Sequence, residues 1–208
     1  MRETSFHPVK SITTGEGGAV LTNNTKLYQR LQLFRNHGIV RDRSRLVNKR
    51  ISGFGWYYEM QGLGFNYRLT DIQAALGLSQ LRKLNKFIKR RKEIASIYNQ
   101  ELSHLDEIIL PREKPPAESA WHIYCIRLKD YKKRSKVFRK LREANIGTQV
   151  HYLPVYKHPY YRGLFGNQEK NFPNAELYYR QALSLPIYPD LKDSQITYVT
   201  RTLKKIIK

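Results

Sequence analysis

The spacing of apolar residues in the first part of the chain predicts a turn, a strand and a helix. Residues 13–22 hold three glycines followed by an apolar run, which is typical of a tight turn leading into a strand. Residues 24–36 carry apolar side chains at spacings of three and four, which predicts a helix with one apolar face. Gly38 then suits the left-handed conformation that ends many helices.

A second, longer helical pattern begins at Thr70. Thr70 and Gln73 have the spacing of a capping box, and apolar residues continue at helical spacings as far as Leu102. This pattern predicts one continuous helix from residue 71 to Leu102. The preceding residues 41–65 are polar, basic and rich in glycine, which predicts a long surface loop.

The C-terminal part of the chain alternates between short elements. Prolines between residues 111 and 116 mark a boundary before it. Alternation of strands and helices is typical of a small α/β domain. We therefore expect two domains, residues 1–105 with the long connecting helix and residues 106–208. The pattern in the second predicts strands at residues 121–128 and 148–152, and helices at residues 133–144, 175–182 and 194–207.

The charge is strongly positive, with 38 lysines and arginines against 17 acidic residues and a formal net charge of +21. Such an excess favours anionic partners, among them nucleic acids, acidic membranes and phosphorylated substrates. The basic residues are scattered, however, and no zinc-finger spacing or RNA-binding motif accompanies them. We therefore expect no specific nucleic-acid partner, and any such binding should be weak and sensitive to salt.

The compartment is indicated by what the sequence lacks. It contains no apolar run long enough to cross a membrane and no apolar leader at its start, so we expect neither a membrane span nor secretion. The single cysteine, Cys125, cannot form an internal disulfide and fits a reducing cytoplasm. Because Cys125 lies in an apolar run, we interpret it as an inert core thiol rather than a nucleophile.

Residue types and spacings alone do not single out a catalytic site. The six histidines lie far apart and lack metal-ligand spacing, so no metal site is expected. The glycines of residues 15–18 match no phosphate-binding loop, and a plain turn explains them equally well. Lys10 is one of many basic residues, and it could act as a nucleophile only if its amine were uncharged.

Five motifs, at residues 5–23, 33–38, 64–77, 149–154 and 182–186, resemble in the same order those of one enzyme family. The chain is similar to the DegT/DnrJ/EryC1/StrS aminotransferases, which use pyridoxal 5′-phosphate to aminate keto groups on nucleotide-linked sugars. Within that family it most resembles the transaminases of the pseudaminic-acid pathway, which act on C4 of a UDP-linked 4-keto-6-deoxy-N-acetylhexosamine.

The resemblance implies a fold, a cofactor and partners. The fold is α/β, comprising part of an aspartate-aminotransferase-like large domain (fold type I of the pyridoxal-phosphate enzymes) and a C-terminal small α/β domain. The cofactor is pyridoxal 5′-phosphate. The partners are a nucleotide-sugar substrate, an amino donor such as glutamate, and a second copy of the chain in a homodimer.

The resemblance also implies roles for particular residues. Lys10 matches the catalytic lysine, which forms a Schiff base with the cofactor and carries a proton between cofactor and sugar. Ser5 and Asn66 match residues that contact the cofactor phosphate or the substrate, Asn66 across the dimer interface. Turn or capping roles are the alternative for these two residues.

A substrate-contacting segment of the family is matched by Gln149, Val150, His151 and Tyr152. For His151 and Tyr152, simple packing at the end of a strand is the alternative.

One departure from the family pattern limits what the chain is expected to do alone. The family's lysine lies near the middle of the chain, whereas Lys10 lies near the start. The preceding half contributes the phosphate-binding turn, the ring stacked on the cofactor and the aspartate that pairs with its pyridine nitrogen. This implies a truncated or decayed gene product, one half of a split enzyme with a separate N-terminal half, or a gene model begun at an internal methionine. The alternative function is a non-catalytic remnant or a basic interaction module.

Overall fold

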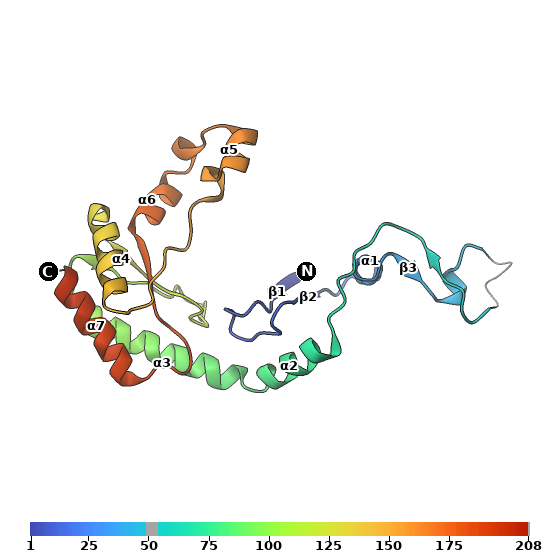
Figure 1. Cartoon of the computed structure of the whole chain (residues 1–208), viewed down its shortest axis with the longest axis horizontal. Coiled ribbons are helices and arrows are strands. Elements are labelled where there is room, and N and C mark those ends of the chain that lie inside the picture. The colour runs from blue at the N-terminus through green and yellow to red at the C-terminus, as the bar shows by residue number, and fades with distance from the viewer. Residues whose placement is uncertain (49–53, 208) are drawn as a thin grey trace. The chain divides into compact units, whose positions relative to one another are not determined.

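The computed structural model describes residues 1–48 and 54–207. The chain divides into two compact units, Met1–Leu84 and Asn85–Lys208. Figure 1 shows the elements of both units along the chain, and each unit is described by itself below. The second helical pattern is divided between the units, with residues 71–84 in the N-terminal unit and the rest, from Asn85, in the C-terminal unit. The domain boundary expected near residue 105 stays a prediction.

The N-terminal unit begins with a pair of antiparallel strands. β1 (Arg2–Ser5) pairs with β2 (Gly18–Leu21), and Ser5 lies opposite Gly18. The turn and strand predicted within residues 13–22 are therefore confirmed. Gly18 must stay small because a Cβ atom there would lie 2.9 Å from the carbonyl oxygen of Thr4 on the facing strand.

Helix α1 (Thr25–Arg35) confirms the first predicted helix. The side chain of Asn24 caps its start by accepting a hydrogen bond from the Leu27 backbone N–H at 3.0 Å. At its end, the Gly38 N–H donates to the Leu33 carbonyl at 2.8 Å with φ at 69°. The predicted glycine stop is therefore correct, and any side chain at Gly38 would collide with the Gly62 carbonyl oxygen, 1.8 Å from an ideal Cβ.

The predicted loop of residues 41–65 is more ordered than the pattern indicates. It contains a short 3-10 turn at Arg43–Arg45 and the strand β4 (Glu59–Met60), which pairs in antiparallel fashion with β3 (Ile39–Val40) just before the loop. Residues 49–53 lie outside the described residues. Two-residue strands are too short for alternation to reveal, so the sequence could not predict this pairing.

The glutamate of β4 organises the described part of this loop. The Glu59 carboxylate accepts hydrogen bonds from the backbone N–H groups of Val47 and Asn48, both at 2.7 Å. These donors, with Gln61 and Tyr57, outweigh desolvation and lower the pKa of Glu59 to about 2.

The single helix predicted from residue 71 to Leu102 is wrong, because the structure has two helices. The capping box at the start of α2 (Asp71–Leu81) is confirmed, but the Lys83 N–H then donates to the Gln80 carbonyl in a tight turn before α3 (Leu84–Leu102). A tight turn of this kind interrupts the regular helical hydrogen bonds. Apolar spacings of three and four continue through it, so the sequence pattern does not reveal the break.

The C-terminal unit is built on a three-stranded antiparallel sheet. Its strand order is β5 (Ile108–Ile109), β6 (Tyr124–Leu128) and β7 (Ala182–Leu185). The strand predicted at residues 121–128 is therefore confirmed in its second part. The strand predicted at residues 148–152 is wrong, because only a single bridge pairs Gln149 with Ser184 there.

The cysteine prediction needs a similar correction. Alternate residues of β6 are fully buried, but Cys125 lies on the other face and is only half-buried. The Tyr178 hydroxyl donates to its sulfur at 3.3 Å. Cys125 is therefore part of a strand, as predicted, but it is not a core residue.

Helices cover this sheet and largely match the sequence pattern. The three helices predicted after residue 130 are confirmed as α4, α6 and α7, while the seven-residue α5 was not predicted because it is too short for a periodic pattern. Among the residues that the structure describes, no helix is both long and apolar enough to cross a membrane. The bounds of these helices are α4 Arg134–Glu143, α5 Pro159–Phe165, α6 Pro173–Gln181 and α7 Asp193–Ile207.

The core of the C-terminal unit lies between α3, the sheet, α4 and α7. It is one cluster of buried apolar side chains, with Tyr98, Leu141 and Leu203 fully enclosed. A buried cation also joins α3 to the segments that flank β6 and β7, because the Arg91 guanidinium donates to the carbonyl oxygens of Trp121, His122 and Ile187 at 2.8–3.2 Å. Burial lowers the pKa of Arg91, and these carbonyl oxygens replace part of its lost hydration.

Candidate functional site

Lys10 lies in the connection between β1 and β2. Its backbone N–H donates to the His7 carbonyl at 2.9 Å, which closes a tight turn, and its side chain is exposed. In the described parts of the chain, residues 1–48 and 54–207, the Lys10 amine makes no hydrogen bond or ion pair. The Lys10 amine is therefore exposed and unpaired among the described residues.

Hydrogen bonds across its base hold the Lys10 connection in shape. Phe6 donates from its N–H to the Gly17 carbonyl at 2.9 Å, and its own carbonyl accepts from the N–H of Thr14 and the hydroxyl of Thr13, at 3.0 and 2.8 Å. Thr13 also accepts from the Gly15 N–H. Sequence reasoning gave Thr13 and Thr14 no role, although the paired threonines before a glycine turn were the available signal.

Ser5 stands at the end of β1, on the same hairpin as Lys10. Its hydroxyl oxygen accepts a weak hydrogen bond from the His7 N–H at 3.3 Å, which leaves the hydroxyl hydrogen available to donate elsewhere. An amine and a hydroxyl donor therefore share one exposed segment. This donor set fits part of pyridoxal 5′-phosphate, because an aldehyde requires an amine and a phosphate accepts from a hydroxyl.

Asn66 belongs to the same unit but to another segment. Its backbone forms a bridge with Asn36 at the end of α1, and the neighbouring Phe65 and Tyr67 donate to the Phe34 and Arg35 carbonyls. The backbone is therefore fixed, while the Asn66 side chain is exposed and has no hydrogen-bond partner among the described residues. Such an amide can bind a phosphate or sugar oxygen, and the structure offers no capping contact for its side chain.

The four substrate-segment residues all lie in the C-terminal unit. Gln149 and Tyr152 are exposed, whereas Val150 and His151 are half-buried. The His151 and Tyr152 rings meet edge to face at 4.6 Å, and burial lowers the pKa of His151. The structure thus groups the predicted residues as Lys10 with Ser5 on one hairpin, Asn66 elsewhere in that unit, and this segment in the other unit.

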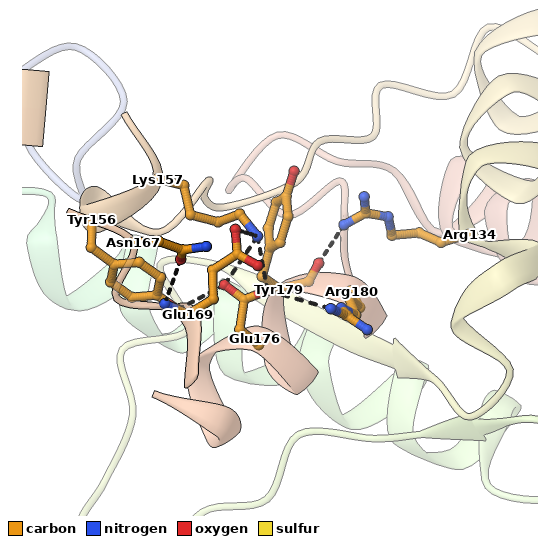
Figure 2. A network of polar contacts seen from close by, with 8 residues as sticks. All are labelled: Arg134, Tyr156, Lys157, Asn167, Glu169, Glu176, Tyr179 and Arg180. Carbon is orange, nitrogen blue, oxygen red and sulfur yellow. Dashed lines mark hydrogen bonds and ion pairs between the residues drawn. The ribbon is translucent and has the colours of Figure 1, made fainter. Parts of the chain in front are cut away.

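A network of charged and aromatic residues anchors the chain that follows this segment (Figure 2). Glu176 on α6 is buried; its carboxylate lies 2.9 Å from the Lys157 amine and accepts from the Tyr156 hydroxyl at 2.9 Å. Lys157 also lies 3.2 Å from Glu169, and Arg180 lies 3.8 Å from Glu176. Burial opposes the charge on Glu176, but these donors outweigh it and lower the pKa of the carboxyl. Glu176 and Arg180 are four positions apart on α6, a spacing that a sequence can reveal. The contacts of Glu176 with Tyr156 and Lys157 join residues 20 and 19 positions apart, so no spacing rule could have predicted them.

The profile of the DegT/DnrJ/EryC1/StrS aminotransferase family matches residues 1–204. The chain belongs to this family. The resemblance expected from the five motifs is therefore confirmed over nearly the whole sequence. Members of the family depend on pyridoxal phosphate.

Individual relatives agree with this assignment. The chain is 38% identical to the UDP-4-amino-4,6-dideoxy-N-acetyl-beta-L-altrosamine transaminase of Campylobacter jejuni, over 98% of this chain and 51% of that protein. Helicobacter pylori PseC, an aminotransferase involved in the biosynthesis of pseudoaminic acid, superposes with a TM-score of 0.88 at 30% identity, over 99% of this chain and 52% of that one. The PLP form of the putative sugar aminotransferase Spr1654 from Streptococcus pneumoniae gives a TM-score of 0.84 at 28% identity, over 99% and 51%.

These superpositions confirm the expected fold class, a partial aminotransferase fold of type I. The chain spans about half the length of the relatives that it matches. The activity, substrate and partners of a complete enzyme are therefore proposed for this chain below.

Proposed function

We propose that this chain provides the lysine-bearing part of a pyridoxal-phosphate aminotransferase that acts on a nucleotide-linked 4-keto-6-deoxy sugar. The observation that supports this most is the family match across residues 1–204 together with the free, exposed amine of Lys10. The Campylobacter relative, named as a transaminase of a UDP-linked amino sugar, supports the substrate class. A further segment or a second polypeptide would provide the other half of the fold, and the complete enzyme would act as a cytoplasmic homodimer.

The proposed roles follow from the chemistry of each side chain. When bound, the cofactor supplies an aldehyde and a ring that withdraws electrons from the substrate carbon. Lys10 would bind the aldehyde through Nζ, which requires an uncharged amine, and the same atom would then hold and move the proton of the amino-transfer step. The Ser5 hydroxyl would donate to a phosphate oxygen.

The remaining residues would bind the substrate rather than react with it. The Asn66 amide would donate to a phosphate or sugar oxygen from the backbone position that its bridge to Asn36 fixes. Residues 149–152 would contact the nucleotide sugar, with the exposed Gln149 and Tyr152 providing polar and aromatic contacts. Glutamate is the amino donor that the family resemblance favours.

The test is a reassembly experiment. The chain is produced together with a polypeptide corresponding to the half of the Campylobacter relative that it does not span, and the complex is incubated with pyridoxal 5′-phosphate and reduced with borohydride. Peptide mapping should place the pyridoxyl group on Lys10, and the complex should transfer an amino group from glutamate to a UDP-linked 4-keto sugar.

Two lysine variants make the test specific. Lys10→Ala should remove both the label and the transfer, whereas Lys26→Ala, which changes an exposed lysine on α1, should leave both unchanged. A label that stays at another lysine in the active Lys10→Ala complex would place the reactive amine elsewhere. Transfer by the chain without the added half would contradict the proposed division of the enzyme.

A further inference from the structure

Ser184 on β7 is the point at which the predicted substrate segment is attached to the sheet. Its backbone N–H donates to the Gln149 carbonyl at 2.8 Å, and its carbonyl accepts from the Gln149 N–H at 3.4 Å. The Thr148 hydroxyl donates to the same carbonyl at 2.8 Å. Ser184 itself is 3% exposed. Every one of these contacts joins residues that are 35 or 36 positions apart in the sequence, so the segment takes its place from β7.

The Ser184 side chain forms a hydrogen bond with the His151 ring. The Ser184 Oγ lies 2.8 Å from His151 Nδ1. Over the described ranges 1–48 and 54–207, Ser184 Oγ has no other hydrogen-bond partner. A hydroxyl in a buried position must donate its hydrogen, since a buried donor without a partner is destabilising by about 1–3 kcal/mol.

This requirement selects one form of the histidine ring. If Nδ1 carried a hydrogen, Ser184 would have to accept it and its own hydroxyl hydrogen would have no acceptor. If Nδ1 is bare, Ser184 donates to it and both groups are satisfied. The hydrogen of the neutral ring then sits on Nε2. Burial, which lowers the pKa of His151, favours the same neutral ring.

We propose that Ser184 is a positioning residue that holds neutral His151 in the Nε2–H form, so that the ring offers one hydrogen-bond donor to an acceptor oxygen of the nucleotide sugar. The ring form follows from the contacts within the C-terminal unit. The identity of the ligand, a nucleotide sugar, is the part of this proposal that rests on the proposed function. An Nε2–H donor selects an oxygen acceptor and disfavours a donor group at that point, which makes Ser184 an indirect determinant of specificity.

The ring form is tested on the 208-residue chain without cofactor, substrate or added half. Histidine side chains are labelled with ¹⁵N, and long-range proton–nitrogen spectra are recorded about two pH units above the ordinary histidine pKa of about 6.5. His151 should show a protonated Nε2 and a bare Nδ1. A protonated Nδ1 in the unmodified chain would overturn the proposal, whatever the variants do.

Three variants test the role of the serine. Ser184→Ala should give a mixture of the two ring forms, and Ser184→Thr, which keeps the hydroxyl, should restore the Nε2–H form. Thr200→Val is the matched control, because it removes a fully buried hydroxyl from α7 that donates to the Thr197 carbonyl of its own helix. It should leave the His151 spectrum unchanged. An unaltered His151 spectrum in folded Ser184→Ala would contradict the positioning role.

The ligand is tested separately in the reassembled enzyme. Ser184→Ala should raise KM for the nucleotide sugar roughly 2–10-fold with little change in kcat, the loss expected for one weakened hydrogen bond. Ser184→Thr, which keeps the hydroxyl, should return KM most of the way to the value of the unmodified enzyme. If the ring form changes in Ser184→Ala and KM does not, His151 does not bind the nucleotide sugar and that part of the proposal fails. If the enzyme cannot be reassembled, the proposed function fails while the spectra still decide the ring form.

Discussion

The two units of this protein bury very different amounts of apolar surface. The C-terminal unit encloses a continuous cluster of apolar side chains from α3 to α7. In the described part of the N-terminal unit, the buried apolar residues are Val40 and Leu46. Large side chains there lie open instead, such as Leu63 at 79% and Ile72 at 85% exposure. One unit therefore has a core of its own, whereas the other has apolar faces that require a covering surface.

The two units also differ in how completely their strands are paired. In the C-terminal unit, β6 is paired on both sides and carries Tyr124, Ile126 and Leu128 into the core. In the N-terminal unit, the described residues give β1 and β2 no third strand. A two-stranded hairpin is marginally stable by itself, and its open edges invite pairing. The unit that carries Lys10 is thus the one with the least internal support.

The largest expected effect comes from removing the same side chain in each unit. Leu203→Ala, at a fully buried position on α7, should lower the free energy of unfolding by about 2–5 kcal/mol, because it leaves a cavity in the core. Leu78→Ala, on the exposed face of α2, should change it by less than about 0.5 kcal/mol. Urea unfolding followed by circular dichroism measures both, and equal losses would mean that α2 is packed as tightly as α7.

A smaller effect is expected from the charged network of Figure 2. Glu176→Gln should lower the free energy of unfolding by about 1–3 kcal/mol, because it removes the nearer of the two carboxylate charges beside Lys157 in a mostly buried setting. Glu143→Gln is the control, since the exposed pair of Arg139 and Glu143 at 3.7 Å should contribute less than about 1 kcal/mol. Thermal melts of the two variants should separate clearly, and matching melts would show that the network is not stabilising.

The same carboxyl sets a pH dependence for the C-terminal unit. The pKa of Glu176 is lowered on folding, so its contribution is present above the ordinary value of 4.5 and is lost as the pH falls through the lower folded value. Melting temperatures recorded from pH 6 downward should therefore fall less steeply in Glu176→Gln than in the unmodified chain below about pH 4.5. Parallel curves would contradict the lowered pKa.

In the N-terminal unit the corresponding acid effect should stay local and small. The pKa of Glu59 is lowered to about 2, so its hold on the Val47 and Asn48 backbone is present above 4.5 and weakens as the pH approaches 2. NMR titration should find the Glu59 carboxyl still ionised at pH 3.5, where an ordinary glutamate is largely protonated. A titration midpoint near 4.5 would show that the carboxylate does not hold this loop.

The sequence predicted those elements whose signals are local. The capping box at Thr70, the glycine stop at Gly38 and the periodic helices of the C-terminal unit are confirmed because each depends on neighbours within a few residues. The break between α2 and α3 was missed because the apolar spacing continues through it. The strand β7 was not predicted, and the strand predicted at residues 148–152 is only a single bridge at Gln149, because both depend on pairing with distant segments.

The candidate site was predictable only through resemblance to a family. Lys10 carries no pattern of its own that separates it from the other basic residues, and its site assignment, like those of Ser5 and Asn66, stays a prediction. The contact of Ser184 with His151 could not have been predicted, because the two residues are 33 positions apart in the sequence. Rules based on neighbouring residues cannot predict contacts between residues so far apart in the sequence. Chemistry that depends on such contacts can be recognised only in the folded chain.

The contrast between the two units is tested most directly by hydrogen–deuterium exchange on the isolated chain, read by mass spectrometry. Peptides from α3, β6, β7 and α7 should be protected by a common, large factor, because they open only when the C-terminal core unfolds. Peptides from β1, β2, α1 and α2 should exchange much faster, and the added half of the reassembly experiment should slow them. Uniform strong protection across both units in the isolated chain would contradict the account.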